Sequence, residues 1–316
     1  MITWGINALN HGSSLAVFAN GRLSMFDRCD EDHLDQKIIH RAFNYGGPDN
    51  VFWYENPWLK KARQIKAKQW HRVFDLSDLP SMYIKQLKIP YSKLRYTAHH
   101  ASHAAAGYYT SPFNHAAVVV VDAIGEFECA TIWEAKHGEM KKVWSRTYPH
   151  SLGLFYSAFT QFLGLEPIRD EHLLQEMARK GNPKRFRDSI GFYFNKGVLN
   201  VDYNFHKGIH NWSCETWTEQ EKFDLAAAVQ EEFEIQVGGI MMTAKQLTGS
   251  DCLVYMGGCA MNSDANRREV EPRFKHIWSL PDPGDSSSSV GAVLYHTKQR
   301  VWDWHNGVVK HIKVSV

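Results

Sequence analysis

Two stretches of the chain carry the same order of hydrophobic and polar positions. In the first stretch, the apolar run Ile2–Ala8 precedes the strand candidates Leu15–Ala19 and Arg22–Phe26, which flank the hairpin-turn pair Asn20-Gly21. The second stretch repeats this order with Val118–Ala123, Glu128–Ala135, His137-Gly138 and Met140–Trp144. A repeat over about 115 residues indicates an internal duplication, because solenoid repeats span only about 20–50 residues.

Each stretch is followed by segments whose pattern is typical of helices. The helix candidates are Pro57–Phe74, His99–Tyr109, Ser151–Leu163, Glu171–Arg179 and Asp224–Leu247. A further strand, Cys252–Met256, runs into Gly257-Gly258 and a helix, and Ile277–Leu280 leads into a loop that ends at Asp285. Hairpins combined with strand–helix units predict an α/β fold with mixed sheets flanked by helices. We expect two halves, residues 1–115 and 116–316, with a ligand cleft where buried strands end.

Composition narrows the class of protein. The 316 residues are 44% hydrophobic and 22% charged with a formal net charge of +2, which excludes disordered and coiled-coil classes. No apolar run approaches the ~20 residues that a membrane span needs, and the first residues lack the pattern of a secretory signal. We therefore expect a cytoplasmic chain without a membrane partner. The five cysteines are scattered with no CxxC pair, so a disulfide framework and a thiolate zinc site are excluded.

Histidine is over-represented, and two pairs have the spacing of metal ligands on a helix. His99 and His103 precede an alanine run, so both imidazoles share one helix face, whereas Gly208 favours a loop for His206 and His210. With 17 histidines, chance alone gives about one such pair. Asp122 and Asp285 each follow a buried strand and are the candidate carboxylate ligands, although either could simply cap a turn. Two histidines with carboxylates suit Fe(II), Mn or Zn, and the residues alone do not choose.

Three further segments could bind ligands. Gly257-Gly258 at a strand end lets a nucleotide approach bare backbone, with a plain tight turn as the alternative. The polar turn Asn10–Ser14 contains His11, a candidate base or ligand or simply a turn residue. Segment Trp53–Arg72 interleaves tryptophans with lysines and arginines, which is typical of a nucleic-acid surface. The alternative there is an amphipathic helix that buries its tryptophans and leaves a basic face in solvent.

Taken in order, five motifs resemble the amino-terminal domain of the O-carbamoyltransferases, the family of nodulation protein U and of the cephamycin and tobramycin carbamoyltransferases. The motifs are Gly5–Ser14, His99–Ala105, Tyr108–Phe113, His150–Ser157 and Met256–Asn262. The resemblance covers almost the whole chain. It implies a duplicated actin-like (ASKHA, ribonuclease H-like) fold, in agreement with the internal repeat.

The resemblance also implies a site. A metal ion, usually iron, would bind His99, His103, Asp122 and Asp285. The nucleotide of a carbamoyl-adenylate, made from carbamoyl phosphate and ATP, would lie against Gly257, Gly258 and Asn262. His11 would lie near the acceptor hydroxyl as the catalytic residue, with Ser13 and Ser14 as candidate contacts to the acceptor or a phosphate.

Three departures from the family pattern bear on function. Ala123 replaces the usual glycine after Asp122, and Leu173 replaces a family lysine. The chain stops at Val316, without the carbamoyl-adenylate synthase domain that follows in family members. We therefore expect either that a separate activating protein supplies the intermediate or that carbamoyl phosphate is used directly.

The expected activity is metal-dependent transfer of a carbamoyl group to an acceptor hydroxyl. The basic, tryptophan-containing segment favours a hydroxymethylated base in a nucleotide or in DNA as the acceptor. The alternatives are transfer to a sugar or antibiotic hydroxyl, and an inactive nucleotide-binding partner protein, which the altered segment Glu171–Ala178 motivates. Threonylcarbamoyl transfer to tRNA fits the motifs less well.

Overall fold

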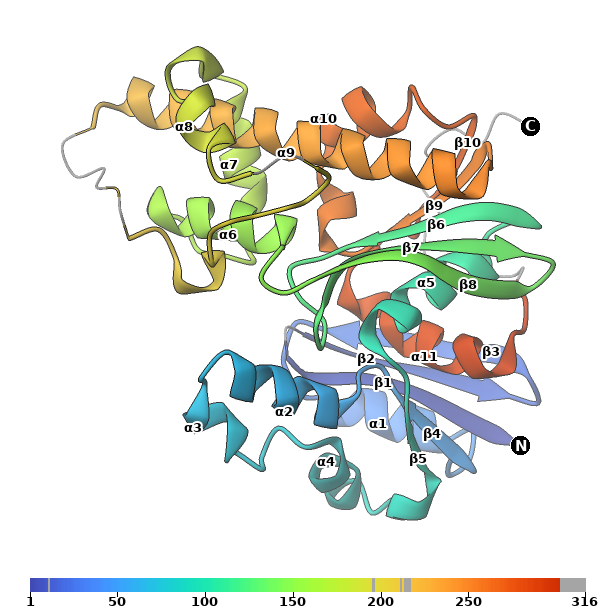
Figure 1. The fold of residues 1–316 in the computed structure, drawn as a ribbon. Helices are drawn as coiled ribbons and strands as arrows, with labels where there is room; N and C mark the ends of the chain where they lie inside the picture. The colour runs from blue at the N-terminus through green and yellow to red at the C-terminus, as the bar shows by residue number, and fades with distance from the viewer. Residues whose placement is uncertain (11, 195–196, 211, 213–216, 302–316) are drawn as a thin grey trace.

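The computed structural model describes residues 1–10, 12–194, 197–210, 212 and 217–301. Its framework is a pair of five-stranded mixed sheets stacked on either side of two helices (Figure 1). The strands of the first sheet are β1 (Ile2–Asn10), β2 (Gly12–Ala19), β3 (Arg22–Cys29), β4 (Asn50–Trp53) and β5 (Leu94–Tyr96). Those of the second are β6 (His115–Val121), β7 (Glu128–Lys136), β8 (Glu139–Thr147), β9 (Cys252–Met256) and β10 (His276–Trp278).

The two sheets have the same topology. The first runs β3-β2-β1-β4-β5 and the second, from its hairpin edge, runs β8-β7-β6-β9-β10. In each, an antiparallel three-stranded meander continues into two parallel strands. This order is that of a duplicated ribonuclease H-like unit, so the predicted actin-like fold is confirmed. Both predicted hairpin turns form, with positive φ at Asn20, Gly21, His137 and Gly138.

Helices cover both sheets. They are α1 (Gln36–Phe43), α2 (Pro57–Lys66), α3 (Trp70–Val73), α4 (Pro80–Gln86), α5 (His99–Thr110), α6 (Leu152–Phe162), α7 (Glu171–Ala178), α8 (Arg187–Gly191), α9 (Glu219–Thr248), α10 (Ser263–Ala265) and α11 (Ser288–Thr297). Helices α5 and α11 form the layer between the sheets, and α9 lies along the outer face of the second sheet (Figure 1).

The central layer depends on small residues. Every residue of α5 is buried, and its alanines belong to the same hydrophobic cluster as Val118 and Val120 of β6 and Phe18 of β2. At Gly291 of α11, a Cβ atom would overlap the backbone of Ser102. The two helices therefore pack at backbone distance, and the hydrophobic cluster around them contains residues of both sheets.

The structure corrects several local expectations. Pro57–Phe74 is not one helix: α2 ends at Lys66, and α3 starts only after Lys68, whose φ is +58°. The expected turn Asn10–Ser14 is shorter, because β1 extends to Asn10 and β2 begins at Gly12. After Gly257, the chain first forms a 3-10 turn (Gly258–Met261), and the predicted helix follows as α10 and a π-helical turn (Asn266–Val270). Within the described part of the chain, no helix combines the length and apolar composition needed to cross a bilayer.

Candidate metal centre and the adjoining cavity

Helix α5 presents two imidazoles on one face. His99 and His103 are separated by one helical turn, and their Nε2 atoms lie 3.1 Å apart. Both side chains are buried: His99 is 2% exposed and His103 is fully buried. The helical spacing predicted from the sequence is therefore present, and the pair faces inward to the centre of the molecule.

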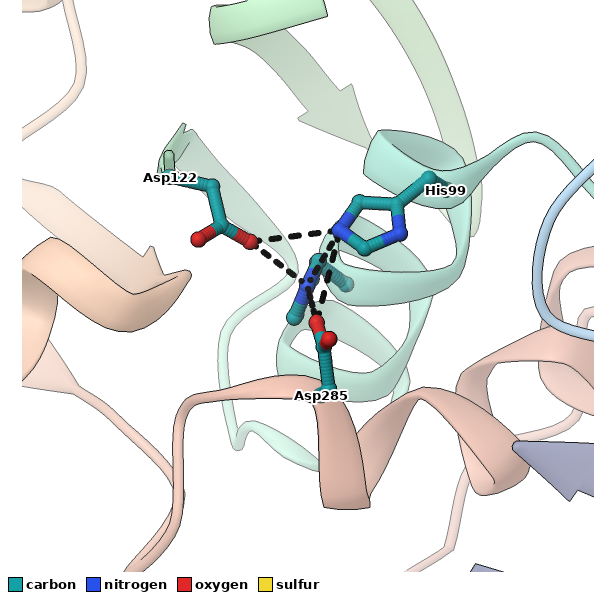
Figure 2. Close-up of side chains that lie close together, drawn as sticks. His99, Asp122 and Asp285 are labelled. Carbon is teal, nitrogen blue, oxygen red and sulfur yellow. Dashed lines mark hydrogen bonds and ion pairs between the residues drawn. The ribbon is translucent and has the colours of Figure 1, made fainter. Parts of the chain in front are cut away.

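Two carboxylates from distant segments meet this pair (Figure 2). Asp122 directly follows β6, and Asp285 opens the 3-10 turn (Asp285–Ser287) that leads into α11. An Asp122 oxygen lies 3.2 Å from the Nε2 atoms of both histidines, and an Asp285 oxygen lies 3.4 Å from His99 and 3.1 Å from His103. The four predicted ligands thus come together from three segments of the chain, with ligand atoms all within 4.8 Å of one another.

These spacings fit a metal ion. A divalent ion about 2.1 Å from each nitrogen or oxygen separates neighbouring ligands by about 3.0 Å in an octahedron and about 3.4 Å in a tetrahedron. The five separations that involve a histidine range from 3.1 to 3.4 Å. Two imidazoles and two carboxylates suit iron, manganese or zinc, so the donor set fits the expected ion without selecting one.

The electrostatics of the cluster also favour a cation. Burial opposes charge on His99, but the carboxylates of Asp285 and Asp122 outweigh burial and raise the pKa of this imidazole to about 10. Burial likewise opposes ionisation of Asp122, yet hydrogen bonds from His103 and His99 hold its pKa well below the usual range. The negative charges of Asp122 and Asp285 therefore stabilise positive charge between the four side chains. Either protons on the imidazoles or a divalent ion can provide that charge.

Glu126 holds the cluster in place and was not predicted from the sequence. It is 3% exposed and accepts hydrogen bonds from the backbone N–H groups of His99 and Asn56, at 3.0 and 2.7 Å. Burial raises the pKa of this carboxyl group. Glu126 thus caps the first turn of α5 from another segment of the chain, and fixes where the helix begins relative to β4 and β6.

Residues near the start of β2 support the Asp285 loop. Ser14 donates to the backbone oxygen of Ser286 at 2.6 Å and to the Ser289 hydroxyl, while Asn7 of β1 donates to the backbone oxygen of Asp285. Ser13 is 1% exposed and its hydroxyl lies 3.0 Å from the Cys29 sulfur. The structure therefore gives Ser13 and Ser14 partners within the protein; their role toward an acceptor stays a prediction.

The glycine pair of the predicted nucleotide site lies beside the cluster. Gly257 has a φ of +92° and a Cβ there would overlap the backbone of Val121, so only glycine fits. At Gly258 an added Cβ would lie 3.2 Å from an Asp122 oxygen. Asn262 is 8% exposed, exchanges hydrogen bonds with Gln230 and caps α10. The glycines thus adjoin the candidate metal ligands, whereas the Asn262 side chain is engaged inside the protein.

The other histidines considered in the sequence analysis are His11, His206 and His210. His11, the candidate catalytic residue, lies outside the described residues. His206 lies in a 3-10 turn (Phe205–Lys207) and is bonded at 2.8 Å to Gln69. Among the described residues, the metal-type cluster contains neither His206 nor His210.

A cavity of about 620 Å³ opens onto the cluster. Its wall includes His99, Asp122, Asp285 and Gly258 at the cluster. It also includes polar side chains of the α2–α3 segment: Lys60, Arg63, Gln64, Gln69 and Arg72. Sequence reasoning assigned that segment to a surface, so this part of the wall was missed. The volume is that of a small-molecule site.

Residues 50–294 match the family described as carbamoyltransferase N-terminus, and the chain belongs to this family. It is 30% identical to an uncharacterized protein, sll1178, of Synechocystis sp., over 88% of this chain and 46% of that protein. It is 26% identical to nodulation protein NolNO of Sinorhizobium fredii, over 64% of this chain and 31% of that protein. The chain thus spans less than half the length of these curated relatives.

Solved structures also align with the chain. Full-length HypF in a phosphate- and nucleotide-bound form aligns with 96% of this chain and 56% of its own, at 15% identity and a TM-score of 0.47. The activator of the 2-hydroxyisocaproyl-CoA dehydratase from Clostridium difficile aligns with 94% of this chain and 96% of its own, at 9% identity and a TM-score of 0.44.

Proposed function

We propose that the chain transfers a carbamoyl group to an acceptor hydroxyl at a divalent metal centre. The observation that carries this proposal is the convergence of His99, His103, Asp122 and Asp285 at metal-ligand spacing, in a cavity of a carbamoyltransferase-family domain. These four residues would hold the ion, with Fe(II) as the first candidate and Mn or Zn as alternatives.

The transfer itself exchanges one bond to the carbamoyl carbon. When bound, the ion supplies Lewis-acid chemistry to the carbamoyl oxygen or the acceptor oxygen. The acceptor oxygen bonds to the carbamoyl carbon, the bond to the phosphate oxygen breaks, and AMP leaves from carbamoyl-adenylate. The hydroxyl proton passes to a nearby base, for which we propose His11.

The donor side would use the glycine pair. Bare backbone at Gly258, which lines the cavity, would let a nucleotide approach within reach of the Asp122 carboxylate, while Gly257 allows the close contact with the Val121 backbone that places the turn there. We propose ATP or carbamoyl-adenylate as the nucleotide ligand, with carbamoyl phosphate as the carbamoyl source. A separate activating protein is the proposed supplier of the intermediate, and direct use of carbamoyl phosphate is the alternative.

Two acceptor classes have support. Trp58 and Trp70 are 63% and 52% exposed on the basic α2–α3 segment, which favours a hydroxymethylated nucleobase in a nucleotide or in DNA, since exposed aromatic rings stack on bases. This exposure contradicts the alternative in which the segment buries its tryptophans; only Trp53, in β4, is buried. The cavity, with a volume of about 620 Å³, favours a small-molecule acceptor such as a sugar or antibiotic hydroxyl.

The test is incubation with labelled carbamoyl phosphate, ATP and Fe(II), with hydroxymethylated DNA, the hydroxymethylated nucleotide or an aminoglycoside as acceptor. Mass gain of one carbamoyl group identifies the acceptor, and the gain disappears when the ion is chelated. DNA affinity that falls steeply with added salt supports a DNA acceptor; salt-indifferent binding speaks against it. Metal binding without transfer to any acceptor, with and without a carbamoyl-adenylate synthase, refutes the proposal and favours an inactive nucleotide-binding protein.

A further inference from the structure

Helix α2 turns its polar side chains inward. Lys60, Arg63 and Gln64 are 8%, 7% and 1% exposed, whereas Trp58 on the same helix is 63% exposed. A surface helix normally buries its apolar stripe and exposes its charges. The inverted pattern places a cation and an amide in the wall of the cavity that also contains the metal-type cluster.

Several polar atoms in this wall are buried without a partner. Within the described residues, the Nε and Nη1 atoms of Arg63 and both amide atoms of Gln64 have no hydrogen-bond partner. The Nδ1 atom of His206, which lines the same cavity, also has none. Native proteins rarely leave buried polar groups unpaired, because each one loses its hydrogen bonds to water. Such a group facing a cavity indicates a ligand that completes it.

The charges around these atoms select an anion. Lys60 pairs with the buried Glu55 at 2.6 Å, so these two charges cancel. Lys61 is held by Asp78 at 2.7 Å and is not part of the wall. Among the residues that the structure describes, that leaves the Arg63 and Arg72 guanidinium groups as the charges of the α2–α3 wall without a carboxylate partner.

His206 lines the same cavity as Arg63 and Arg72. Burial lowers the pKa of this imidazole, and the charges of Arg63 and Arg72 lower it further, so both act on the same ring. A neutral His206 bonded to Gln69 can then donate or accept without adding charge.

We infer that this wall binds the phosphate group of a substrate, with the fork of Arg63 as its principal contact and Gln64 and Arg72 as further donors. A guanidinium offers paired N–H donors that match two phosphate oxygens, and burial strengthens such bonds. The inference rests on the proposed function for the origin of the phosphate. It belongs either to the carbamoyl phosphate donor or to an acceptor nucleotide, and either origin places a phosphate group in the cavity that contains the metal-type cluster.

The test compares two variants that each remove one positive charge from α2. Arg63→Met removes the buried fork, and Lys66→Met removes an exposed charge one turn away as the control. Full-length protein loaded with metal is titrated calorimetrically with four probes: inorganic phosphate, carbamoyl phosphate, hydroxymethyl-dCMP and the hydroxymethyl-deoxycytidine nucleoside. We expect Arg63→Met to weaken at least one phosphate-bearing probe by about 10- to 100-fold, with the nucleoside unchanged and Lys66→Met like the wild type.

The pattern of losses identifies the source of the phosphate. A loss confined to carbamoyl phosphate assigns the wall to the donor, and a loss confined to the nucleotide assigns it to the acceptor. Wild-type protein that binds no phosphate-bearing probe, or Arg63→Met that binds all of them as the wild type does, overturns the inference. If Arg63→Met does not fold, Arg63→Lys and Gln64→Leu replace it, with the same expected direction. Binding is measured without turnover, so absent carbamoyl transfer with intact phosphate binding refutes the proposed function alone.

Discussion

Removal of one imidazole from the cluster tests the metal centre directly. We choose His103→Gln because His103 is fully buried and its Nε2 lies 3.1–3.2 Å from the other three ligand atoms, so its loss leaves a gap in the set. His100→Gln is the matched control. His100 has the same burial and lies on the same helix, but it bonds to Thr131 at 3.0 Å and lies outside the cluster.

The expected magnitude follows from linkage between binding and folding. With free Fe(II) at 100 times its Kd, the wild type gains about 2.7 kcal/mol of stability. Loss of one of four ligands should weaken binding by about 100-fold or more, which leaves a gain of about 0.4 kcal/mol at the same concentration. The assay is thermal unfolding with and without Fe(II) under anaerobic conditions, together with metal content by mass spectrometry.

The comparison of the two variants decides the outcome. We expect His100→Gln to lose stability with and without metal but to retain the full metal-dependent increase. An increase of about 2.7 kcal/mol in His103→Gln would show that this imidazole is not a ligand. An equal loss of the increase in both variants would point to damage to α5 instead of loss of a ligand.

Three further predictions concern the scaffold. Glu126→Ala should lower the free energy of unfolding by about 1–3 kcal/mol in urea titrations, because two buried N–H groups lose their acceptor, while Glu126→Gln should cost less. Gly291→Ala should lower stability by about 1–3 kcal/mol or more in thermal unfolding, and an unchanged midpoint would contradict backbone contact between α5 and α11. Burial raises the pKa of the Cys129 thiol to about 12 and that of Cys259 well above its usual value, so both thiols stay protonated at pH 8. Iodoacetamide should therefore label these two only in urea, and peptide mapping of native protein that finds them labelled would contradict their burial.

The parts of the fold that were predicted carry strong local signals. Asn20-Gly21 and the alanine run after His103 determine a turn and a helix almost independently of the rest of the chain. The contact between His99 and Asp285, which are far apart in sequence, could not be predicted from local sequence patterns alone. It followed from the internal duplication and the family resemblance, which together indicate which strand ends share an edge.

The elements and residues that were not predicted either have sequence patterns too short to recognise or depend on contacts between residues far apart in sequence. Strands β4 and β5 are four and three residues long, shorter than a window in which alternation can be recognised. Glu126 caps a helix that begins 27 residues earlier in the chain, a contact that exists only after folding. The burial of Arg63 could not be predicted from amphipathic patterning, which places charged residues in solvent. Helix α2 faces a polar cavity, so its charged side chains point inward.

The path of the chain between β4 and β5 has a consequence for how such domains diversify. The two strands are parallel neighbours with fixed register, so the helices between Trp53 and Leu94 form an excursion whose ends are anchored side by side. Such excursions tolerate insertion, deletion and replacement because the sheet that holds their ends is unaffected. The segment between β4 and β5, which forms one wall of the cavity, can thus change in sequence and length, while the elements that carry the imidazoles and carboxylates keep their structure.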